Sequence, residues 1–276
     1  MIKQIPNLFT LLNLVFGCLA IVLTLQNGIT IQYVPLESQL NEVLGKIWMQ
    51  PLKFEDGNQL VFLSEKIPLA SLFIFAAAVV DFLDGFVARL FKASSEMGKQ
   101  LDSLADVVSF GVAPSLIVYQ LLRFSYMQEE GGLDISIIWL LPAFLIACAG
   151  AYRLARFNID STQSYGFKGV PIPAVGILIA SLPLMLHTEN AIINLSGILT
   201  NKWVLYTVIF IVSWLMISKL PLMALKFKDY SIKNNLPKII LLVVAVLSAI
   251  LFHWLAVPLV FIVYIILSLL YKQQSS

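Results

Sequence analysis

The chain has 276 residues, of which 59% are hydrophobic and only 12% are charged, and its mean hydropathy is +0.88. This composition excludes a soluble globular domain of this length and is typical of a membrane protein with several spans. The net charge of +2 is too small to indicate a nucleic-acid partner, and the two cysteines, Cys18 and Cys148, lie inside apolar runs, which argues against a disulfide framework.

The first apolar run covers Asn7–Leu25. No small-residue cleavage site follows it, so we interpret it as a retained first span rather than as a signal peptide. Its polar residues Asn7, Thr10 and Asn13 recur at three-residue spacing, which places them on one face of a helix. Two interpretations of this face stay open, namely hydrogen bonds to a neighbouring helix and contacts to a ligand inside the bundle.

The longest polar segment covers residues 27–66 and carries charges of both signs. We expect an extramembrane loop here, with a short amphipathic helix around Leu36–Met49. The second span is expected at about Ile67–Arg89 and the third at about Leu101–Leu122. Just inside the third span, Gly111 and Pro114 are expected to kink or loosen the helix.

Four carboxylates lie around the connection between the second and third spans. Asp81 and Asp84 are three residues apart, and Asp102 and Asp106 are four apart, so on helices each pair shares one face. A carboxylate at membrane depth is costly unless it is paired, solvated or bound to a cation. If two such faces come together, their carboxylates repel one another, which favours the binding of divalent cations. A site with only oxygen ligands favours magnesium, manganese or calcium over zinc.

The residues between the acidic pairs favour a binding site over the alternative, salt-bridged helix ends that would use Arg89, Lys92 and Lys99. Gly85 leaves room for the close approach of a ligand, and Ala88 keeps the same helix face open. Arg89 offers a planar fork of donors that suits phosphate. Carboxylates and an arginine, without a Ser–His or Cys–His pair nearby, indicate metal-assisted phosphoryl chemistry.

The rest of the chain predicts five further spans. They are expected at about Ile135–Ala151, from Pro171 and Pro173 onward, at Trp203–Ile217, at Ile239–Phe252 and at Leu255–Leu270, with Trp254 and Pro258 at the hairpin between the last two. Arg153 and Arg156 follow the fourth span, one helical turn apart. Two interpretations of this pair stay open, an interfacial anchor and a phosphate site.

The acidic stretch reads D-x2-D-G-x2-A-R-x8-G-x3-D-x3-D, in which Gly98 is the second fixed glycine. This pattern resembles, without a departure, the signature of the CDP-alcohol phosphotransferases, integral membrane enzymes of phospholipid synthesis. The segments PNLFTLLNLVFG (6–17), RLARFN (153–158), FKGVPIPA (167–174) and SKLPLMALKF (218–227) are similar to the phosphatidylserine synthase branch of that family.

The resemblance and the predicted spans together give an all-α, polytopic membrane helix bundle. Residues 1–227 are expected to form a six-helix core in which 27–66 is an extracytoplasmic loop, and residues 228–276 a two-helix extension. The extension is assigned to packing or dimerisation, so a homodimer is one interpretation of it. The resemblance implies two divalent cations, Mg2+ or Mn2+, held by Asp81, Asp84, Asp102 and Asp106, with Asp106 either a ligand or the catalytic base.

The reaction implied by the resemblance moves the phosphatidyl group of CDP-diacylglycerol to L-serine and releases CMP. The alternatives are a different acceptor alcohol, glycerol 3-phosphate or inositol phosphate, and a transporter with an acidic ion site. Membrane lipids are the other expected partners. Substrate contacts are assigned to polar and small residues from four segments: Asn7, Thr10, Asn13, Gly85, Ala88, Arg89, Gly98, Arg153, Arg156 and Lys168.

The basic residues are distributed unevenly between the two ends of the expected spans. With eight spans and the N-terminus inside, only five of the 18 Lys and Arg residues fall outside: Lys46, Lys53, Lys66, Arg123 and Lys202. The positive-inside rule therefore predicts that the acidic stretch faces the cytoplasm, in the cytoplasmic (inner) membrane.

Overall fold

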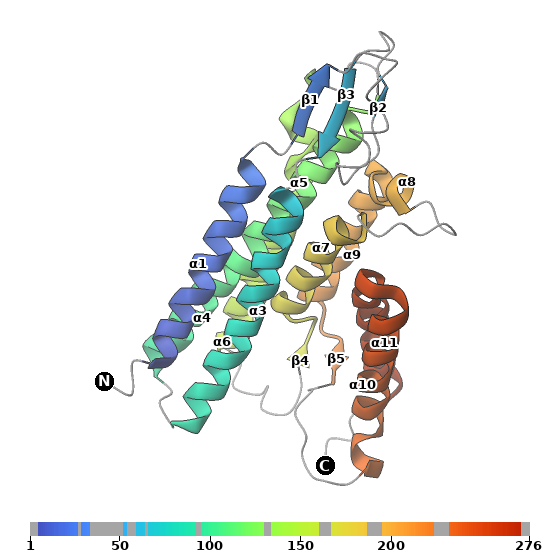
Figure 1. The fold of residues 1–276 in the computed structure, drawn as a ribbon. Coiled ribbons are helices and arrows are strands. Elements are labelled where there is room, and N and C mark those ends of the chain that lie inside the picture. Colours follow the sequence, from blue (N-terminus) through green and yellow to red (C-terminus); the bar gives the residue numbers. More distant parts are fainter. Residues whose placement is uncertain are drawn as a thin grey trace.

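The computed structural model describes residues 5–26, 29–33, 52–53, 59–63, 66–91, 95–129, 134–159, 167–186, 195–223 and 232–271. Long apolar helices run side by side through this part of the chain (Figure 1). Five helical stretches are long and apolar enough to cross a membrane, namely Pro6–Leu25, Lys66–Leu90, Glu96–Tyr126, Ile137–Ile159 and Asn235–Leu270. The expected all-α membrane bundle is confirmed, while its division into a core and an extension stays a prediction.

The first three spans occur as predicted, with small shifts at their ends. They are α1 (Ile5–Leu25), α3 (Lys66–Leu90) and a continuous helical stretch made of α4 (Glu96–Asp106), the π-helix η2 (Val107–Val112) and α5 (Ala113–Tyr126). The helix that was predicted to kink or loosen at Gly111 and Pro114 forms the π-helix η2 at this point. Pro114 has no N–H to donate to the carbonyl four residues back, and just before it the N–H of Ala113 bonds to Val108 O, five residues back.

The remaining spans are also helical. Two 3-10 turns, η4 (Ile137–Trp139) and η5 (Leu141–Phe144), lead into α6 (Leu145–Ile159), which is followed by α7 (Ile172–Leu186), the short α8 (Leu195–Leu199) and α9 (Lys202–Ile217). α10 (Ile232–Phe252) and α11 (Ala256–Leu270) form a hairpin around the 3-10 turn η6 (His253–Leu255). Trp254 lies in that turn as expected, and Pro258 lies in the first turn of α11.

Two small sheets lie at opposite ends of the bundle (Figure 1). β1 (Ile29–Tyr33), β3 (Gln59–Leu63) and β2 (Leu52–Lys53) form an antiparallel sheet in that order, within the segment predicted as a loop. The amphipathic helix expected around Leu36–Met49 lies outside the described residues. At the other end, near the start of α1 and the end of α3, β4 (Phe167–Lys168) pairs with β5 (Pro221–Leu222).

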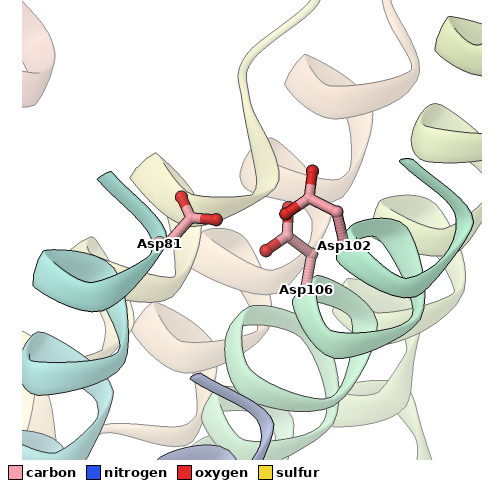
Figure 2. Close-up of side chains that lie close together, drawn as sticks. All are labelled: Asp81, Asp102 and Asp106. Carbon is pink, nitrogen blue, oxygen red and sulfur yellow. The ribbon is translucent and has the colours of Figure 1, made fainter. Parts of the chain in front are cut away.

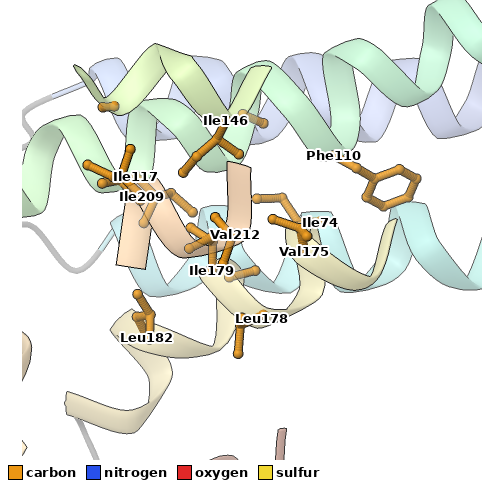
Figure 3. Packing of buried hydrophobic residues seen from close by; sticks show 14 of the residues in the cluster. Ile74, Phe110, Ile117, Ile146, Val175, Leu178, Ile179, Leu182, Ile209 and Val212 are labelled. Atoms are coloured by element: carbon orange, nitrogen blue, oxygen red, sulfur yellow. The ribbon is translucent and has the colours of Figure 1, made fainter. Parts of the chain in front are cut away.

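The buried apolar residues join α3, η2, α5, α6, α7 and α9 into one core. Figure 3 shows side chains of this core, including Phe110, Ile146 and Ile179. α1 approaches η2 so closely that a Cβ on Gly17 would lie 2.8 Å from Ser109 Cα. Large apolar side chains on the outside of the bundle are exposed, among them Val79, Phe82 and Ile250, as expected of helices that face lipid.

Candidate active site

Three of the four predicted carboxylates gather where α3 faces α4 (Figure 2). Asp81, Asp102 and Asp106 each offer one carboxylate oxygen, and these oxygens all lie within 4.8 Å of one another. Asp106 is buried, and the buried Asp102 Oδ1 has no hydrogen-bond partner among the described residues. Carboxylates at this separation repel one another, and a set of oxygen donors with an unused buried acceptor fits a hard divalent cation.

The fourth carboxylate, Asp84, lies beside this group, one turn further along α3. It is buried, and its Oδ2 accepts a hydrogen bond of 3.0 Å from Thr10 Oγ1 on α1. The structure thus brings three aspartates into one compact group and holds the fourth against α1. A ligand role for Asp84 stays a prediction.

The alternative of salt-bridged helix ends finds no support in the described part of the chain. Lys99 pairs with Glu96 at 3.2 Å, and within the described part of the chain neither Lys99 nor Arg89 forms an ion pair with the four aspartates. Arg89 is exposed at the end of α3. Lys92, the third expected partner, lies outside the described residues.

The polar face of α1 is turned toward these carboxylates. Asn13 Nδ2 donates to Asp106 Oδ1 at 3.4 Å, and Ser109 Oγ donates to the backbone oxygen of Asn13 at 3.0 Å. Asn7 lies near α4, because a Cβ on Gly98 would be 3.2 Å from Asn7 Oδ1. The interpretation that this face makes hydrogen bonds to neighbouring helices therefore holds for Thr10 and Asn13, while ligand contact stays a prediction.

A cavity of about 150 Å³ lies between α1, α3 and the start of α4. Small and polar residues line it: Pro6, Asn7, Thr10, Asp84, Gly85, Ala88, Ser95, Gly98, Lys99 and Asp102. A Cβ on Gly85 would meet nothing closer than Arg89 Nη1 at 3.7 Å, so the glycine keeps space open rather than permitting helix packing. The cavity adjoins the N-terminus of α4, where the helix dipole favours an anion.

Sequence reasoning missed Ser95 as part of this cavity. Ser95 Oγ accepts a hydrogen bond of 3.0 Å from Gly98 N and caps α4. A serine directly before a helical pattern that opens with an acidic residue, here Glu96, is an N-cap signal that was available in the sequence. Pro6 and Lys99 are further additions, and Lys99 had been considered only as an ion-pair partner.

The two arginines of α6 have different surroundings. Arg156 is held by three backbone oxygens, with Nη1 donating to Ile217 at 2.8 Å and Nη2 donating to Ser218 at 3.1 Å and to Lys168 at 3.2 Å. These bonds give Arg156 a structural role, because they tie α6 to the end of α9 and to β4. Its contact with substrate stays a prediction, as does that of Lys168.

Arg153, one turn earlier, is only 5% exposed and lies with its guanidinium 5.9 Å from the ring centroid of Phe157. Its Nε has no hydrogen-bond partner among the described residues. α6 packs against η2, the π-helix that directly follows Asp106. A buried arginine with an unused donor is suited to bind an anionic group.

Comparison with known proteins agrees with this chemistry. A family model described as CDP-alcohol phosphatidyltransferase matches residues 3–216, which cover every helix up to α9. Three curated relatives are each named CDP-diacylglycerol–serine O-phosphatidyltransferase. The Bacillus subtilis protein is 37% identical over 135 residues, which are 49% of this chain and 70% of the relative.

The Helicobacter pylori (strain J99) protein is 41% identical over 124 residues, 44% of this chain and 48% of the relative. The Mycobacterium tuberculosis protein is 33% identical over 197 residues, 68% of this chain and 63% of the relative. The chain thus spans about half to 70% of the length of these relatives. The hairpin of α10 and α11 lies beyond the residues that the family model matches.

Proposed function

Because the chain belongs to the CDP-alcohol phosphatidyltransferase family, we propose that it transfers the phosphatidyl group of CDP-diacylglycerol to L-serine, giving phosphatidylserine and CMP. The observation that carries the proposal is the group formed by Asp81, Asp102 and Asp106 beside a cavity lined with small and polar residues. The names of the relatives, at 33–41% identity, support serine as the acceptor.

Two divalent cations, Mg2+ or Mn2+, would be held by Asp81, Asp84, Asp102 and Asp106. When bound, such cations neutralise the donor diphosphate and stabilise the charge that develops on the leaving CMP oxygen. Asn7, Thr10, Gly85, Ala88 and Gly98 would contact the nucleotide part of the donor. The acyl chains of the donor would lie in the lipid that surrounds the exposed apolar helix faces.

Asp106 is our candidate for the catalytic base. Its Oδ1 accepts the hydrogen bond from Asn13, which orients the carboxylate, and as a base it would take the serine hydroxyl proton. As the proton moves to Asp106, the serine oxygen attacks the phosphorus that bears the diacylglycerol, and the bond from that phosphorus to the CMP oxygen breaks. Arg153 is our candidate among the three basic residues for binding the serine carboxylate, because it is buried and its Nε has no hydrogen-bond partner among the described residues.

A direct test of the acceptor is CMP release by purified protein supplied with CDP-diacylglycerol, a divalent cation and one alcohol at a time. We expect CMP release with L-serine and little with glycerol 3-phosphate or inositol phosphate. The Asp81→Asn variant is the blank for contaminating activity. Preference for a phosphorylated acceptor would leave the family assignment standing and overturn serine as the substrate.

A further inference from the structure

The helix α4 carries Asp102 and Asp106, and α1 packs along it. The face of α4 that meets α1 is marked by Gly98, because a Cβ there would lie 3.2 Å from Asn7 Oδ1. Leu104 of α4 is 66% exposed, so another face of the helix is open. Contact with α1 on one side alone does not fix how α4 is turned about its axis, and that turn decides where both carboxylates point.

A hydrogen bond from α6 also holds α4. Asn158 Nδ2, in the last turn of α6, donates to Ser103 Oγ of α4 at 2.9 Å. The end of α6 is itself fixed, because Arg156 donates to the backbone oxygens of Ile217 at 2.8 Å and of Ser218 at 3.1 Å. Asn158 therefore joins α4 to an anchored part of the bundle.

The two attachments of α4 lie on either side of its carboxylates. Successive residues of an α-helix are turned by about 100°, so Ser103 is turned by about 140° from Gly98. Asp102 and Asp106 lie between these two residues, at about 40° and about 80° from Gly98. The contact with α1 and the bond from α6 together fix the rotation at which both carboxylates point toward Asp81 (Figure 2).

Asp102 depends on this rotation more directly than Asp106 does. Asp106 Oδ1 accepts a hydrogen bond from Asn13, whereas the buried Asp102 Oδ1 has no hydrogen-bond partner among the described residues. The direction in which a side chain leaves a helix is set by the helix backbone. Ser103 is the next residue along that backbone, so the bond from Asn158 acts directly beside Asp102.

We propose that Asn158 is a positioning residue: through Ser103 it holds α4 at the rotation that directs Asp102 to the divalent cation. This rests on the cation site of the proposed function. Asn158 then supports cation binding without touching the cation or a substrate. Direct contact of Asn158 with either of them would give Ser103 no part, so changing Ser103 separates the two roles.

The test measures Mn2+ binding to the purified protein, which requires neither substrate nor turnover. Free Mn2+ is followed by its electron paramagnetic resonance signal, and the melting temperature is measured in parallel. Asn158→Ala and Ser103→Ala each remove the bond, alone and together in a double-mutant cycle, while Ser103→Thr keeps the hydroxyl. Asn201→Ala is the matched control, because it removes an asparagine bond of 2.9 Å that caps α9 at the end far from Arg156. Asp81→Asn is the blank for Mn2+ bound elsewhere.

We expect Asn158→Ala and Ser103→Ala each to raise the Mn2+ concentration for half-saturation about two- to tenfold, the size of one neutral hydrogen bond. The double variant should raise it no further than either single variant. Both changes introduce alanine, the best helix former, so weaker binding would not come from unfolding of α4 or α6. Ser103→Thr should bind Mn2+ as the wild type does, and Asn201→Ala should lower the melting temperature without changing Mn2+ binding.

Unchanged Mn2+ binding in Ser103→Ala overturns the proposal, whether or not the melting temperature falls. A change confined to Asn158→Ala would indicate direct contact, and effects that add in the double variant would indicate two independent roles, so either result overturns it as well. Failure of the proposed function looks different: the wild type would bind Mn2+, with the same pattern among the variants, but release no CMP with serine. A wild type that binds no Mn2+ overturns this inference together with the two-cation mechanism.

Discussion

At the scale of single residues, the site is defined by groups that a membrane helix tolerates poorly. Asp84 and Asp106 are buried in a bundle whose other faces are apolar, and each accepts one hydrogen bond from α1, from Thr10 and Asn13 respectively. One neutral hydrogen bond does not compensate the burial of a carboxylate. A bound cation would supply the missing stabilisation, so cation binding and the folding of this end of the bundle are expected to be linked.

Metal removal is the first consequence to measure. In excess chelator CMP release should vanish, and it should return when Mg2+ or Mn2+ is added back. The melting temperature should rise with cation concentration in the wild-type protein, because the cation binds only the folded site. In Asp81→Asn that rise should be much smaller. Full activity in chelator would contradict a role for divalent cations.

Asp106→Asn separates a base from a ligand. If Asp106 is the base, the variant should still bind CDP-diacylglycerol, because Asp81, Asp84 and Asp102 remain. The turnover rate should fall about 10²- to 10⁴-fold, the usual contribution of general-base catalysis. Donor binding can be followed by the thermal shift that the substrate causes in the presence of the cation. Loss of donor binding in step with turnover would identify Asp106 chiefly as a ligand.

The sequence was most informative for these residues, because charge inside an apolar run is a rare and costly feature. Spacing alone placed Asp102 and Asp106 on one helix face, and the structure brings them together with Asp81. The sequence could not show that Asp84 accepts a hydrogen bond from Thr10, since that bond depends on how α1 packs against α3.

At the scale of elements, the helix pair formed by α1 and η2 holds the site together. Ser109 lies on the π-helix directly after the carboxylates, and it bonds to the backbone of Asn13 on α1. The two helices approach this closely because Gly17 has no side chain. The π-helix thus directly follows Asp106 and packs against α1. π-Helical segments often occur at functional sites.

Gly17→Ala tests this contact. In a helix with open space the change is stabilising by about 1 kcal/mol. Here the new Cβ would lie 2.8 Å from Ser109 Cα, so the backbones must move apart and the sign reverses. We expect a loss of about 1–3 kcal/mol in the free energy of unfolding, as for other overpacked contacts. CMP release should fall as well, because Asn13 moves with α1.

The neighbouring Cys18→Ala is the matched control, since Cys18 is exposed on the same helix. It should leave both the melting temperature and CMP release unchanged. A Gly17→Ala protein as stable and active as the wild type would contradict the close packing of α1 on η2.

Apolar runs predicted the helices well but their ends less well. α6 continues to Ile159, beyond the expected end at Ala151, because polar residues of RLARFN bond to other elements: Arg156 donates to the end of α9, and Asn158 donates to Ser103 of α4. The sequence analysis did not predict the β4–β5 pair, whose strands have only two residues each. It is stabilised by the turn at Gly169, whose φ of +82° only glycine adopts readily and whose missing Cβ would lie 2.8 Å from Ser218 O. Short strands carry too few residues for a periodic signal.

At the scale of the whole molecule, the two ends of the bundle differ in chemistry. The carboxylates, the β4–β5 pair and the start of α1 lie at one end, and the β1–β3–β2 sheet lies at the other (Figure 1). The eight spans expected from the sequence assign thirteen of the 18 basic residues to the end that holds the carboxylates. The arrangement of the helices agrees with that count, because each successive long helix returns the chain to the opposite end.

Orientation in the membrane follows from this asymmetry and can be measured directly. Gln128 and Lys219 are both exposed, the first after α5 near the β1–β3–β2 end and the second between α9 and β5 at the carboxylate end. Each is changed singly to cysteine in a background that carries Cys18→Ala and Cys148→Ala. The positive-inside rule predicts that a membrane-impermeant maleimide labels Gln128→Cys in intact cells and labels Lys219→Cys only after permeabilisation.

The physical reason for this prediction is the chemistry of the site as much as the charge count. CMP and serine, the product and acceptor of the proposed function, are polar and do not cross a bilayer unaided, so a site with that function should open to the compartment that contains both. Permeabilised cells, in which both variants should be labelled equally, control for reactivity of the two thiols. Labelling of Lys219→Cys in intact cells, with protection of Gln128→Cys, would reverse the orientation and place the carboxylates outside.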